Sequence, residues 1–234
     1  MSNEQKRKLV NLNNEFYRKT AKYFSATRQS FWPGWEKLPL PNEEDKVLDV
    51  ASGNLRFKKF LDGKINQYQY LGVDACDDLP EKNELINGNF MKLDILAAML
   101  EKSEWTSKLP NQEWNYVFCC AFLHHIPSWE WQIEFLKKLS DLVMINGVLV
   151  VNFWQFLSEP KMKNKIITNL GNNDYILAWN EGVKAQRYCH SFTSEEISAI
   201  KTQMQGQNLQ LISEYQADGA NQKMNYYLGW KKIR

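Results

Sequence analysis

The amino-acid sequence predicts an α/β fold, a doubly wound and mostly parallel sheet that ends in an antiparallel C-terminal hairpin. From Lys46 onward, short runs rich in β-branched residues alternate with helical or turn segments, and these runs are apolar along most of their length. Such alternation requires crossover connections, which make the strands parallel, and continuously apolar strands are covered on both faces. Two later runs, 209–215 and 224–230, flank a polar loop, which is typical of an antiparallel pair.

Five segments are expected to form the parallel strands. They are KVLDV (46–50), QYLGVD (69–74), FMKLDI (90–95), NYVFCCAFL (115–123) and GVLVVNFW (147–154). Before them, an apolar stripe predicts a helix over 5–24, formed by Leu9, Leu12, Phe16, Tyr23 and Phe24. The segment 25–42 mixes Pro, Gly and aromatic residues, so it is expected to be a structured loop.

Two further helices are expected later in the chain. Ser128 is the predicted N-cap of the first, and Asn146-Gly147 is expected to close it. Its apolar stripe consists of Trp129, Ile133, Leu136, Leu139 and Val143. Thr193 and Glu196 form a predicted capping box for the second helix, which Gly206 is expected to end.

Composition narrows the class of protein and its environment. The 234 residues are 44% apolar and 24% charged, which fits one ordinary globular domain. No run of about 18 apolar residues occurs, and the N-terminus lacks the apolar core of a signal peptide. We therefore expect a cytoplasmic protein without a membrane partner. The cysteines have no C-x-x-C spacing, so neither disulfides nor a metal site is expected.

Basic residues gather near both ends of the chain, although the formal net charge is only +2. Residues 1–30 hold seven Lys or Arg against two Glu, and the last twelve residues contain four basic side chains and no acid. If the termini lie close together, they would form a basic rim suited to phosphates. The alternative is a solvated lysine surface.

The stretch VLDVASGNLRF (47–57) has the form of a nucleotide-cofactor loop with a single glycine. A dinucleotide loop needs glycine at the positions of Ala51, Gly53 and Arg56, and a bulky Arg56 argues against NAD or FAD. S-adenosylmethionine has no pyrophosphate, so small residues suffice beneath it. Leu55 is compatible with this cofactor only if its side chain points into the helix–sheet interface.

Three acids at successive strand ends support a nucleoside cofactor. Asp74 follows Gly53 by 21 residues, where an acid accepts both ribose hydroxyl hydrogens, and Asp94 ends the next strand, where it can accept from an adenine amino group. Asp49 ends the first strand. Each acid alone could equally be a helix cap or a surface residue. The expected cofactor contacts are Asp49, Ala51, Ser52, Gly53, Asp74, Ala75, Asp94, Ile95, Cys120 and Ala121.

Most of the chain resembles the class I S-adenosylmethionine-dependent methyltransferases, which have a Rossmann-like fold. The resemblance rests on four segments in the family's order and spacing: KVLDVASGNLRF, YLGVDAC, NYVFCCAFLHHIPS and LVMINGVLVVNFW. The departures are Ala51 and Leu55 in place of glycines, and Ile145-Asn146-Gly147 where a Pro-Gly-Gly turn is common.

Within that family the sequence resembles the methyltransferases that esterify 5-carboxymethyluridine at the tRNA wobble position. The segments are KYFSATRQSFWP (22–33), AFLHHIPS (121–128), RYCHSFT (187–193) and NYYLGW (225–230), with Cys189 and Tyr226 departing from the family's Tyr and Trp. The resemblance implies tRNA as a partner and a small zinc-binding activator subunit. An exposed apolar patch near the third strand would indicate that subunit.

The chemistry of such a substrate suggests roles for individual residues. A carboxylate is already ionised at neutral pH, so methyl transfer to it requires positioning and no base. The predicted catalytic residues are His124, His125, Arg187 and His190. The predicted substrate-binding residues are Arg28, Trp32, Phe122, Tyr188 and Asn225. A small-molecule methyltransferase and a catalytically silent fold that binds RNA or a partner are the alternatives.

These interpretations divide residues 1–234 into four parts of a single methyltransferase domain. The N-terminal helix and a substrate-side loop occupy 1–45, and the cofactor-binding core occupies 46–155. An insertion over the sheet edge follows at 156–190, and the C-terminal helix and hairpin occupy 191–234.

Overall fold

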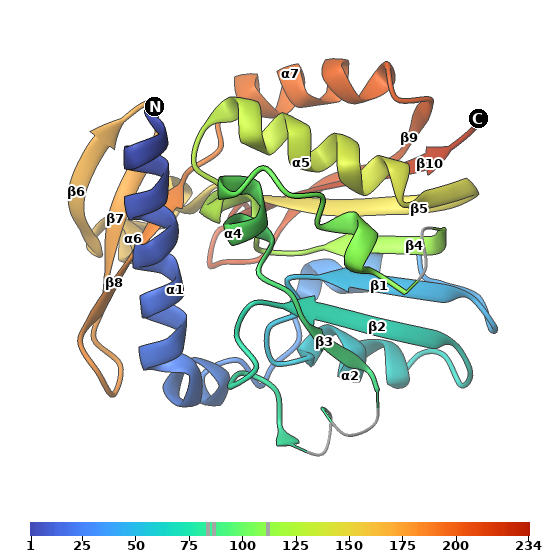
Figure 1. Cartoon of the computed structure of the whole chain (residues 1–234), viewed down its shortest axis with the longest axis horizontal. Helices are drawn as coiled ribbons and strands as arrows, with labels where there is room; N and C mark the ends of the chain where they lie inside the picture. The colour runs from blue at the N-terminus through green and yellow to red at the C-terminus, as the bar shows by residue number, and fades with distance from the viewer. Residues whose placement is uncertain (83–84, 86–87, 111–112) are drawn as a thin grey trace.

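A seven-stranded sheet forms the centre of the computed structural model, which describes every residue except 83–84, 86–87 and 111–112 (Figure 1). Its strand order is β3-β2-β1-β4-β5-β10-β9. The five strands from β1 to β5 pair in parallel, and β10 pairs antiparallel with both β5 and β9. The predicted α/β fold and its antiparallel C-terminal hairpin are confirmed.

The strands of the central sheet fall close to the predicted segments. Their bounds are β1 Lys46–Val50, β2 Gln69–Asp74, β3 Phe90–Lys92, β4 Trp114–Cys119, β5 Val143–Trp154, β9 Leu209–Ala217 and β10 Asn225–Lys232. The third strand is shorter than expected because Asp94 caps α4 (Ile95–Leu100): its carboxylate accepts from the Ala97 N–H at 2.9 Å. A capping bond of this kind ends the extended segment and starts the helix.

Helices cover both faces of the sheet and bury separate apolar clusters (Figure 1). One face carries α4, α5 (Trp129–Asp141) and α7 (Ser194–Gln205). The other carries α2 (Arg56–Asp62) and the 3-10 helix η1 (Pro33–Lys37), whose aromatic side chains pack on the sheet. The predicted capping box of α7 is present. Further short 3-10 helices are η2 Thr106–Lys108, η3 Leu123–His125 and η4 Phe156–Ser158.

Asn146-Gly147 does not close a helix, so that prediction was wrong. The helix ends at Asp141, and β5 begins at Val143 and passes through both residues. Asn146 has φ 67° at a point where the register of β5 against β4 shifts. A Cβ on Gly147 would lie 2.7 Å from the Asn115 carbonyl oxygen. The pair therefore forms an irregularity inside a strand, where asparagine tolerates the left-handed backbone and glycine permits close approach.

The first helix, α1 (Asn3–Ala26), buries a face that differs from the predicted one. Phe16 is buried as expected, but Tyr23 is 42% exposed and Asn13 is almost fully buried. The face turned inward therefore includes polar side chains that the apolar stripe could not indicate. No helix in the described part of the chain is both long and apolar enough to cross a membrane.

Residues 156–190 form a small second sheet and not only an irregular insertion. The strands β6 Ile166–Gly171, β7 Asp174–Trp179 and β8 Ala185–His190 pair antiparallel, and the short helix α6 (Pro160–Lys163) precedes them. This sheet packs against α1, and Figure 1 shows both beside one end of the central sheet. The insertion and α1 together enclose the space next to the strand ends.

The two chain termini lie at opposite ends of the molecule in Figure 1. The N-terminus begins α1, whereas the C-terminus follows β10 at the far end of the central sheet. Lys231, Lys232 and Arg234 therefore lie away from the basic residues at the start of α1, whereas Lys223 precedes β10 at the other end of that strand.

Candidate active site

A cavity of about 390 Å³ lies at the carboxyl ends of β1, β2 and β4 and is bordered by α1 and the small second sheet. This volume is within the usual range of small-molecule sites. All of the predicted cofactor contacts line it: Asp49, Ala51, Ser52, Gly53, Asp74, Ala75, Asp94, Ile95, Cys120 and Ala121. The cavity also contains His124, His125, Arg187, Arg28, Trp32, Phe122 and Asn225. Two predicted residues, Tyr188 and His190, do not line it.

The loop after β1 keeps a left-handed backbone with only one glycine. Ala51, Gly53 and Leu55 have φ values of 60°, 56° and 58°. Leu55 is fully buried in the cluster between α2 and the sheet, and it is not among the residues lining the cavity. Its side chain therefore points into the helix–sheet interface, as the sequence required for a bound cofactor.

Arg56 lines the cavity without closing it. Its guanidinium donates to the Ser30 carbonyl oxygen at 2.7 Å and stacks over the rings of Trp32 and Trp35, at 4.9 and 5.0 Å. These contacts hold the charged group against the aromatic wall formed by η1 and the residue before it. Arg56, whose size argued against NAD or FAD, thus forms part of the cavity wall and leaves the space beside Gly53 open.

Asp49 lies at the floor of the cavity with a single hydrogen-bond donor in the described chain. The Tyr70 hydroxyl donates to it at 2.6 Å. Burial raises the pKa of Asp49 to about 7, despite that hydrogen bond. A cation beside this carboxylate would favour its charged form. Asp49 is therefore suited to a ligand with a positively charged group, such as an ammonium.

Asp74 and Asp94 are oriented by hydrogen bonds that leave acceptor capacity toward the cavity. Asp74 accepts from the Gly53 and Cys76 N–H groups, both at 2.9 Å, and burial raises its pKa to about 6. Asp94 caps α4 with one oxygen and accepts from Asn14 Nδ2 at 2.8 Å with the other. The helix-cap alternative for Asp94 is thus correct, and the residue lines the cavity as well.

His125 is held as a neutral ring by bonds to both nitrogens. Tyr17 Oη lies 2.8 Å from Nε2, and the Tyr188 carbonyl oxygen lies 3.0 Å from Nδ1. Asn13 Nδ2 also lies 3.1 Å from Nδ1, so both ring nitrogens contact polar groups of the protein. Burial, with a smaller contribution from Arg187, lowers the pKa of His125 to about 3. A ring with this pKa is a weak general base.

His124 has free hydrogen-bonding capacity at the cavity. Its Nδ1 has no partner among the described residues, and its ring centroid lies 4.7 Å from that of Trp154. Burial, followed by the nearby His125, lowers the pKa of His124 well below the ordinary value. Both histidines line the cavity. His124 is therefore available to hydrogen-bond a ligand but poorly suited to take up a proton.

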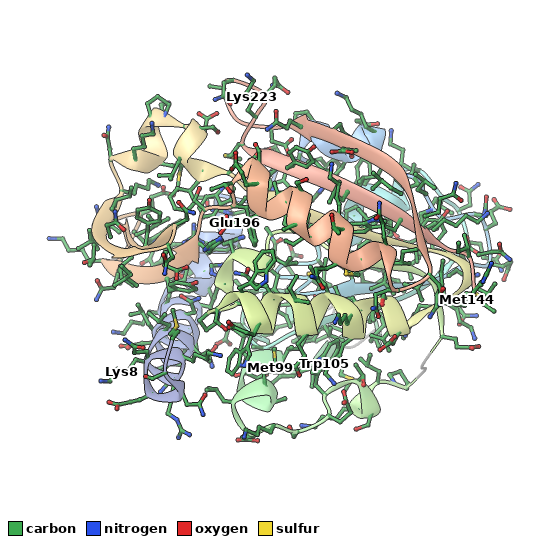
Figure 2. The ribbon with its side chains drawn as sticks, turned by 90° about the horizontal axis from the view of Figure 1, so that it is seen from above. Lys8, Met99, Trp105, Met144, Glu196 and Lys223 are labelled. Atoms are coloured by element: carbon green, nitrogen blue, oxygen red, sulfur yellow. The ribbon has the colours of Figure 1, made fainter. Side chains whose placement is uncertain are left out.

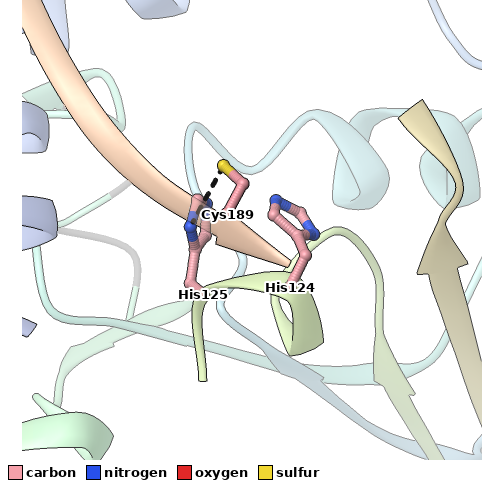
Figure 3. A group of neighbouring side chains, drawn as sticks. All are labelled: His124, His125 and Cys189. Carbon is pink, nitrogen blue, oxygen red and sulfur yellow. Dashed lines mark hydrogen bonds between the residues drawn. The ribbon is translucent and has the colours of Figure 1, made fainter. Parts of the chain in front are cut away.

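His124, His125 and Cys189 lie close together, as Figure 3 shows, with their potential ligand atoms within 4.8 Å of one another. Three features of this trio disfavour a metal ion. Both nitrogens of His125 bond protein groups, burial raises the pKa of the Cys189 thiol to about 12, and the Arg187 guanidinium is close enough to influence both pKa values. A metal needs a deprotonated thiol and no neighbouring cation.

Arg187 brings a buried positive charge to the cavity. Its side chain is packed among the rings of Phe16, Phe24 and Trp154, with the guanidinium carbon 5.1, 6.0 and 5.3 Å from the ring centroids. Only 7% of the residue is exposed, and no described carboxylate forms an ion pair with it. A buried guanidinium without a counter-charge is costly unless a ligand supplies one.

Arg28 adds a second cation at the same ring. Its guanidinium carbon lies 4.0 Å from the centroid of Phe24, on which Arg187 also packs. Burial, and then repulsion from Arg187, lower the pKa of Arg28 to about 10. Both side chains remain cationic at neutral pH, so this part of the cavity attracts an anion.

Tyr188 and His190 face away from the cavity because side chains alternate along β8. Arg187 lines the cavity from this strand, which places residues 188 and 190 on its other side. The Tyr188 hydroxyl donates to Asp174 at 2.6 Å, and His190 Nδ1 lies 2.8 Å from the same carboxylate. Both side chains thus form hydrogen bonds within the small sheet. Their position does not support the predicted contact with substrate.

His190 also lies 3.3 Å from Glu196 through Nε2. Burial lowers the pKa of His190, but Asp174 and Glu196 outweigh this effect and raise it to about 9. The protonated ring therefore joins β7 to α7 between two carboxylates. Its position indicates a structural role.

Trp32 and Asn225, two of the predicted substrate-binding residues, line the cavity. Asn225 Nδ2 donates to Asp218 at 2.9 Å, and the Tyr227 hydroxyl donates to the same carboxylate at 2.6 Å. The Gly34 N–H also donates to Asp218 at 2.9 Å. Asp218 therefore joins the end of β9 to η1 and fixes the position of Asn225.

The sequence did not indicate the polar residues that α1 contributes to the site. Asn13 bonds both the N–H and the carbonyl of Tyr188, Asn14 bonds Asp94, and Tyr17 bonds His125. The only available signal was the spacing of Asn13, Tyr17 and Thr20 on one helical face. Polar residues with that spacing are normally solvent-exposed, so the signal is weak.

A cavity lined by acids at the carboxyl ends of a mostly parallel sheet is suited to a nucleoside cofactor. The chain belongs to the methyltransferase-domain family, whose sequence pattern matches residues 17–214. A protein of Encephalitozoon cuniculi (strain GB-M1), named as a methyltransferase, is 24% identical over 193 residues, covering 80% of this chain and 83% of its own length.

Two solved structures share the fold. A S-adenosylmethionine-dependent methyltransferase from Methanosarcina mazei has a TM-score of 0.60 and 14% identity, covering 87% of this chain and 99% of its own. The 1,6-didemethyltoxoflavin-N1-methyltransferase from Burkholderia thailandensis, with bound 1,6-didemethyltoxoflavin and S-adenosylhomocysteine, has a TM-score of 0.58 and 9% identity, covering 97% and 90% of the two chains. The chain therefore shares the fold of S-adenosylmethionine-dependent methyltransferases and belongs to a methyltransferase family.

The residues present fit this cofactor. When bound, S-adenosylmethionine supplies an electrophilic methyl group on a sulfonium. Asp49 would hold the ammonium of the amino-acid part, Asp74 the ribose hydroxyls, and Asp94 with Ile95 the adenine. The Ser52 hydroxyl supports the fit, since it is buried at the cavity wall without a described hydrogen-bond partner. Neither Leu55 nor Arg56 fills the space, so the loop does not support a catalytically silent fold.

Proposed function

We propose that the protein methylates the carboxylate of a carboxymethylated wobble uridine in tRNA and so forms a methyl ester. The observation that carries the proposal is Arg187, a buried guanidinium at the cavity without a carboxylate partner in the described chain. A carboxylate of the substrate would supply the missing counter-charge through a bidentate contact. Arg28 lies close enough to strengthen the same attraction.

The protonation states of the histidines favour an acceptor that needs no base. The pKa values of His124 and His125 are both depressed, chiefly by burial, so neither ring readily takes a proton from an amine or a hydroxyl at neutral pH. A carboxylate, with an ordinary pKa near 4, is ionised already. The residues around the acceptor would therefore position it and exclude water, and no proton would change hands.

The segments that resemble the wobble-uridine enzymes border one cavity. Arg28 and Trp32 come from the first, Phe122 with the two histidines from the second, Arg187 from the third and Asn225 from the fourth; all of them line the cavity. Segments so far apart in the chain have no structural need to converge at this point. Their convergence supports the proposal of a nucleotide substrate bearing a carboxylate.

Arg187→Met tests the proposal, with Arg18→Met on the exposed face of α1 as the matched control. We expect R187M to lose methyl transfer to tRNA isolated from cells lacking the protein, while its affinity for S-adenosylhomocysteine by calorimetry changes little. The control should methylate at the wild-type rate. Unchanged tRNA methylation by R187M, or no tRNA methylation by the wild-type enzyme purified natively with any bound subunit, would contradict the proposal.

A small-molecule acceptor is the second candidate, and the Burkholderia neighbour with its bound 1,6-didemethyltoxoflavin favours it. A cavity of about 390 Å³ could accept such a ligand. A turnover screen of carboxylated metabolites without RNA separates the two candidates. Rapid turnover there, with none on tRNA, would establish the second.

An activator subunit at β3 is part of the proposal. β3 is the edge strand of the sheet, and its Phe90 and Met91 are only partly buried. The large exposed apolar side chains of the described chain lie elsewhere, including Ile167, Leu170, Leu211 and Ile212. Co-purification of a small zinc protein with the native enzyme, abolished by Met91→Glu, would support the subunit.

A further inference from the structure

We propose that a basic surface beside the cavity mouth binds the sugar–phosphate backbone of RNA next to the methylated nucleotide, an inference that rests on the proposed function. Two segments form this surface: α6 with the residues after it, 160–165, and the loop between β9 and β10, 218–224. We call it the lysine rim. Met162, Lys165 and Met224, one or more from each segment, line the cavity and are partly exposed, so the rim lies where the cavity meets the solvent.

Hydrogen bonds join the β9–β10 loop of the lysine rim to Ser158 and Glu159, the two residues just before α6. The Ser158 hydroxyl donates to the Lys223 carbonyl oxygen at 3.3 Å, and Asn221 Nδ2 donates to the Ser158 carbonyl oxygen at 2.9 Å. The Asn221 N–H also donates to Glu159 at 3.3 Å. Lys223 stands at the end of its loop in Figure 2. The rim is therefore a bonded surface formed by segments distant in the sequence.

The exposed charges of the rim are mostly positive. Lys161, Lys163 and Lys223 are exposed, and none of them forms an ion pair with another described residue. Lys165 is paired with Glu181 at 3.5 Å. The remaining nearby acids, Glu159 and Asp218, are buried and accept hydrogen bonds from the protein, so they present little negative charge to solvent. Three free ammonium groups thus face the solvent beside the mouth.

The position of these lysines indicates a ligand larger than the acceptor itself. Lys161, Lys163 and Lys223 do not line the cavity, so a small molecule held by Arg187 would lie beyond their reach. A nucleotide within a loop of RNA continues on both sides into a chain of phosphates. Lysines contact such phosphates without reading sequence and release counterions, which makes binding depend on salt.

The test compares Lys161→Glu/Lys163→Glu with Lys102→Glu/Lys108→Glu. The control lysines are also exposed and flank Trp105, which Figure 2 places on the opposite side of the molecule from Lys223. Both double variants change the net charge equally. Binding of a fluorescein-labelled anticodon stem–loop is followed by anisotropy over a series of salt concentrations, and methyl transfer to tRNA is measured in parallel.

We expect the rim variant to bind the stem–loop at least tenfold more weakly than the control. Its slope of log affinity against log salt should fall by about 1.4, or about 0.7 for each phosphate that the variant no longer neutralises. KM for tRNA should rise while kcat and the affinity for S-adenosylhomocysteine stay the same. Equal RNA affinity of the two variants, or no RNA binding by the wild type, would show that the lysine rim does not bind RNA. RNA binding that depends on the rim, without any methyl transfer, would support the rim and reject the proposed acceptor.

Discussion

Gly72 on β2 is the residue that makes room for Leu55, and replacing it tests how the glycine-poor loop is accommodated. A Cβ at position 72 would lie 2.6 Å from Leu55 Cδ2, 2.7 Å from Ser52 Oγ and 2.9 Å from Ser52 Cβ. Real Cβ atoms do not approach other atoms so closely, so the loop would have to move. Overpacking of this kind costs about 1–3 kcal/mol.

We therefore expect Gly72→Ala to destabilise the protein by about 2 kcal/mol in urea unfolding, although alanine is normally preferred to glycine within a strand. Because Ser52 lines the cavity, the affinity for S-adenosylhomocysteine should fall as well. Gly63→Ala is the matched control. Gly63 has φ −80°, and a Cβ there would lie 3.5 Å from its nearest neighbour, so this variant should gain about 0.5 kcal/mol of stability.

A double-mutant cycle with Leu55→Ala separates steric conflict from a general effect of alanine at position 72. Leu55→Ala alone should cost about 2–5 kcal/mol, because the leucine is fully buried. In the double variant the shortest contact is gone, so the combined loss should be smaller than the sum by about 1 kcal/mol or more. Additivity within about 0.5 kcal/mol would refute the reasoning.

Three further predictions concern the loop, the small sheet and the cofactor acids. Ala51→Gly should leave the free energy of unfolding within about 0.5 kcal/mol of the wild type, because relief of the left-handed alanine offsets the added entropy of the unfolded chain. As a control, Ala97→Gly inside α4 should cost about 1 kcal/mol in the same urea assay. The folded-state pKa of His190, about 9, exceeds the ordinary 6.5, so its stabilisation is full below pH 6.5 and is lost as pH rises through 9. The free energy of unfolding of the wild type should be about 2–3 kcal/mol lower at pH 9.5 than at pH 6, and His190→Gln should lack this difference. Equal pH dependence of the two proteins would contradict the prediction. The affinity for S-adenosylhomocysteine should fall from pH 8 to pH 5.5 as Asp49 and Asp74 become protonated, and Asp74→Asn should bind it weakly at every pH. A calorimetric affinity that does not change with pH would exclude these two acids as cofactor contacts.

The cofactor half of the site could be predicted because it depends on the ends of parallel strands. Asp49, Asp74 and Asp94 each follow an apolar run, and parallel strands bring such ends to one edge of the sheet whatever the details of packing. The sequence therefore indicated both the fold and the acids. The conformation of Leu55 could only be stated as a requirement, since it depends on Gly72 in the neighbouring strand.

The acceptor half was harder to predict because it depends on strand register and on one helix face. Within RYCH, alternation along β8 decides which side chains reach the cavity, and the sequence alone did not show that Arg187 faces in while His190 faces out. Likewise, the polar face of α1 became a functional face only because the small sheet covers it. Asn13 and Tyr17 could have been found only by asking why polar residues recur at helical spacing.

The loss of two glycines from the cofactor loop is consistent with a working site, because other interactions hold the same backbone. The Ser52 N–H donates to the Val73 carbonyl at 3.0 Å, the Gly53 N–H donates to Asp74 at 2.9 Å, and the Leu55 N–H donates to the Ser52 carbonyl at 3.0 Å. A left-handed leucine costs about 1–2 kcal/mol, whereas burying its side chain contributes about 1.5–3 kcal/mol. The burial offsets the strain, and the turn needs glycine only where the backbone lies beneath the ligand. Gly53 occupies that position, and a Cβ there would meet no protein atom within 4 Å, so the space above it is left for the cofactor.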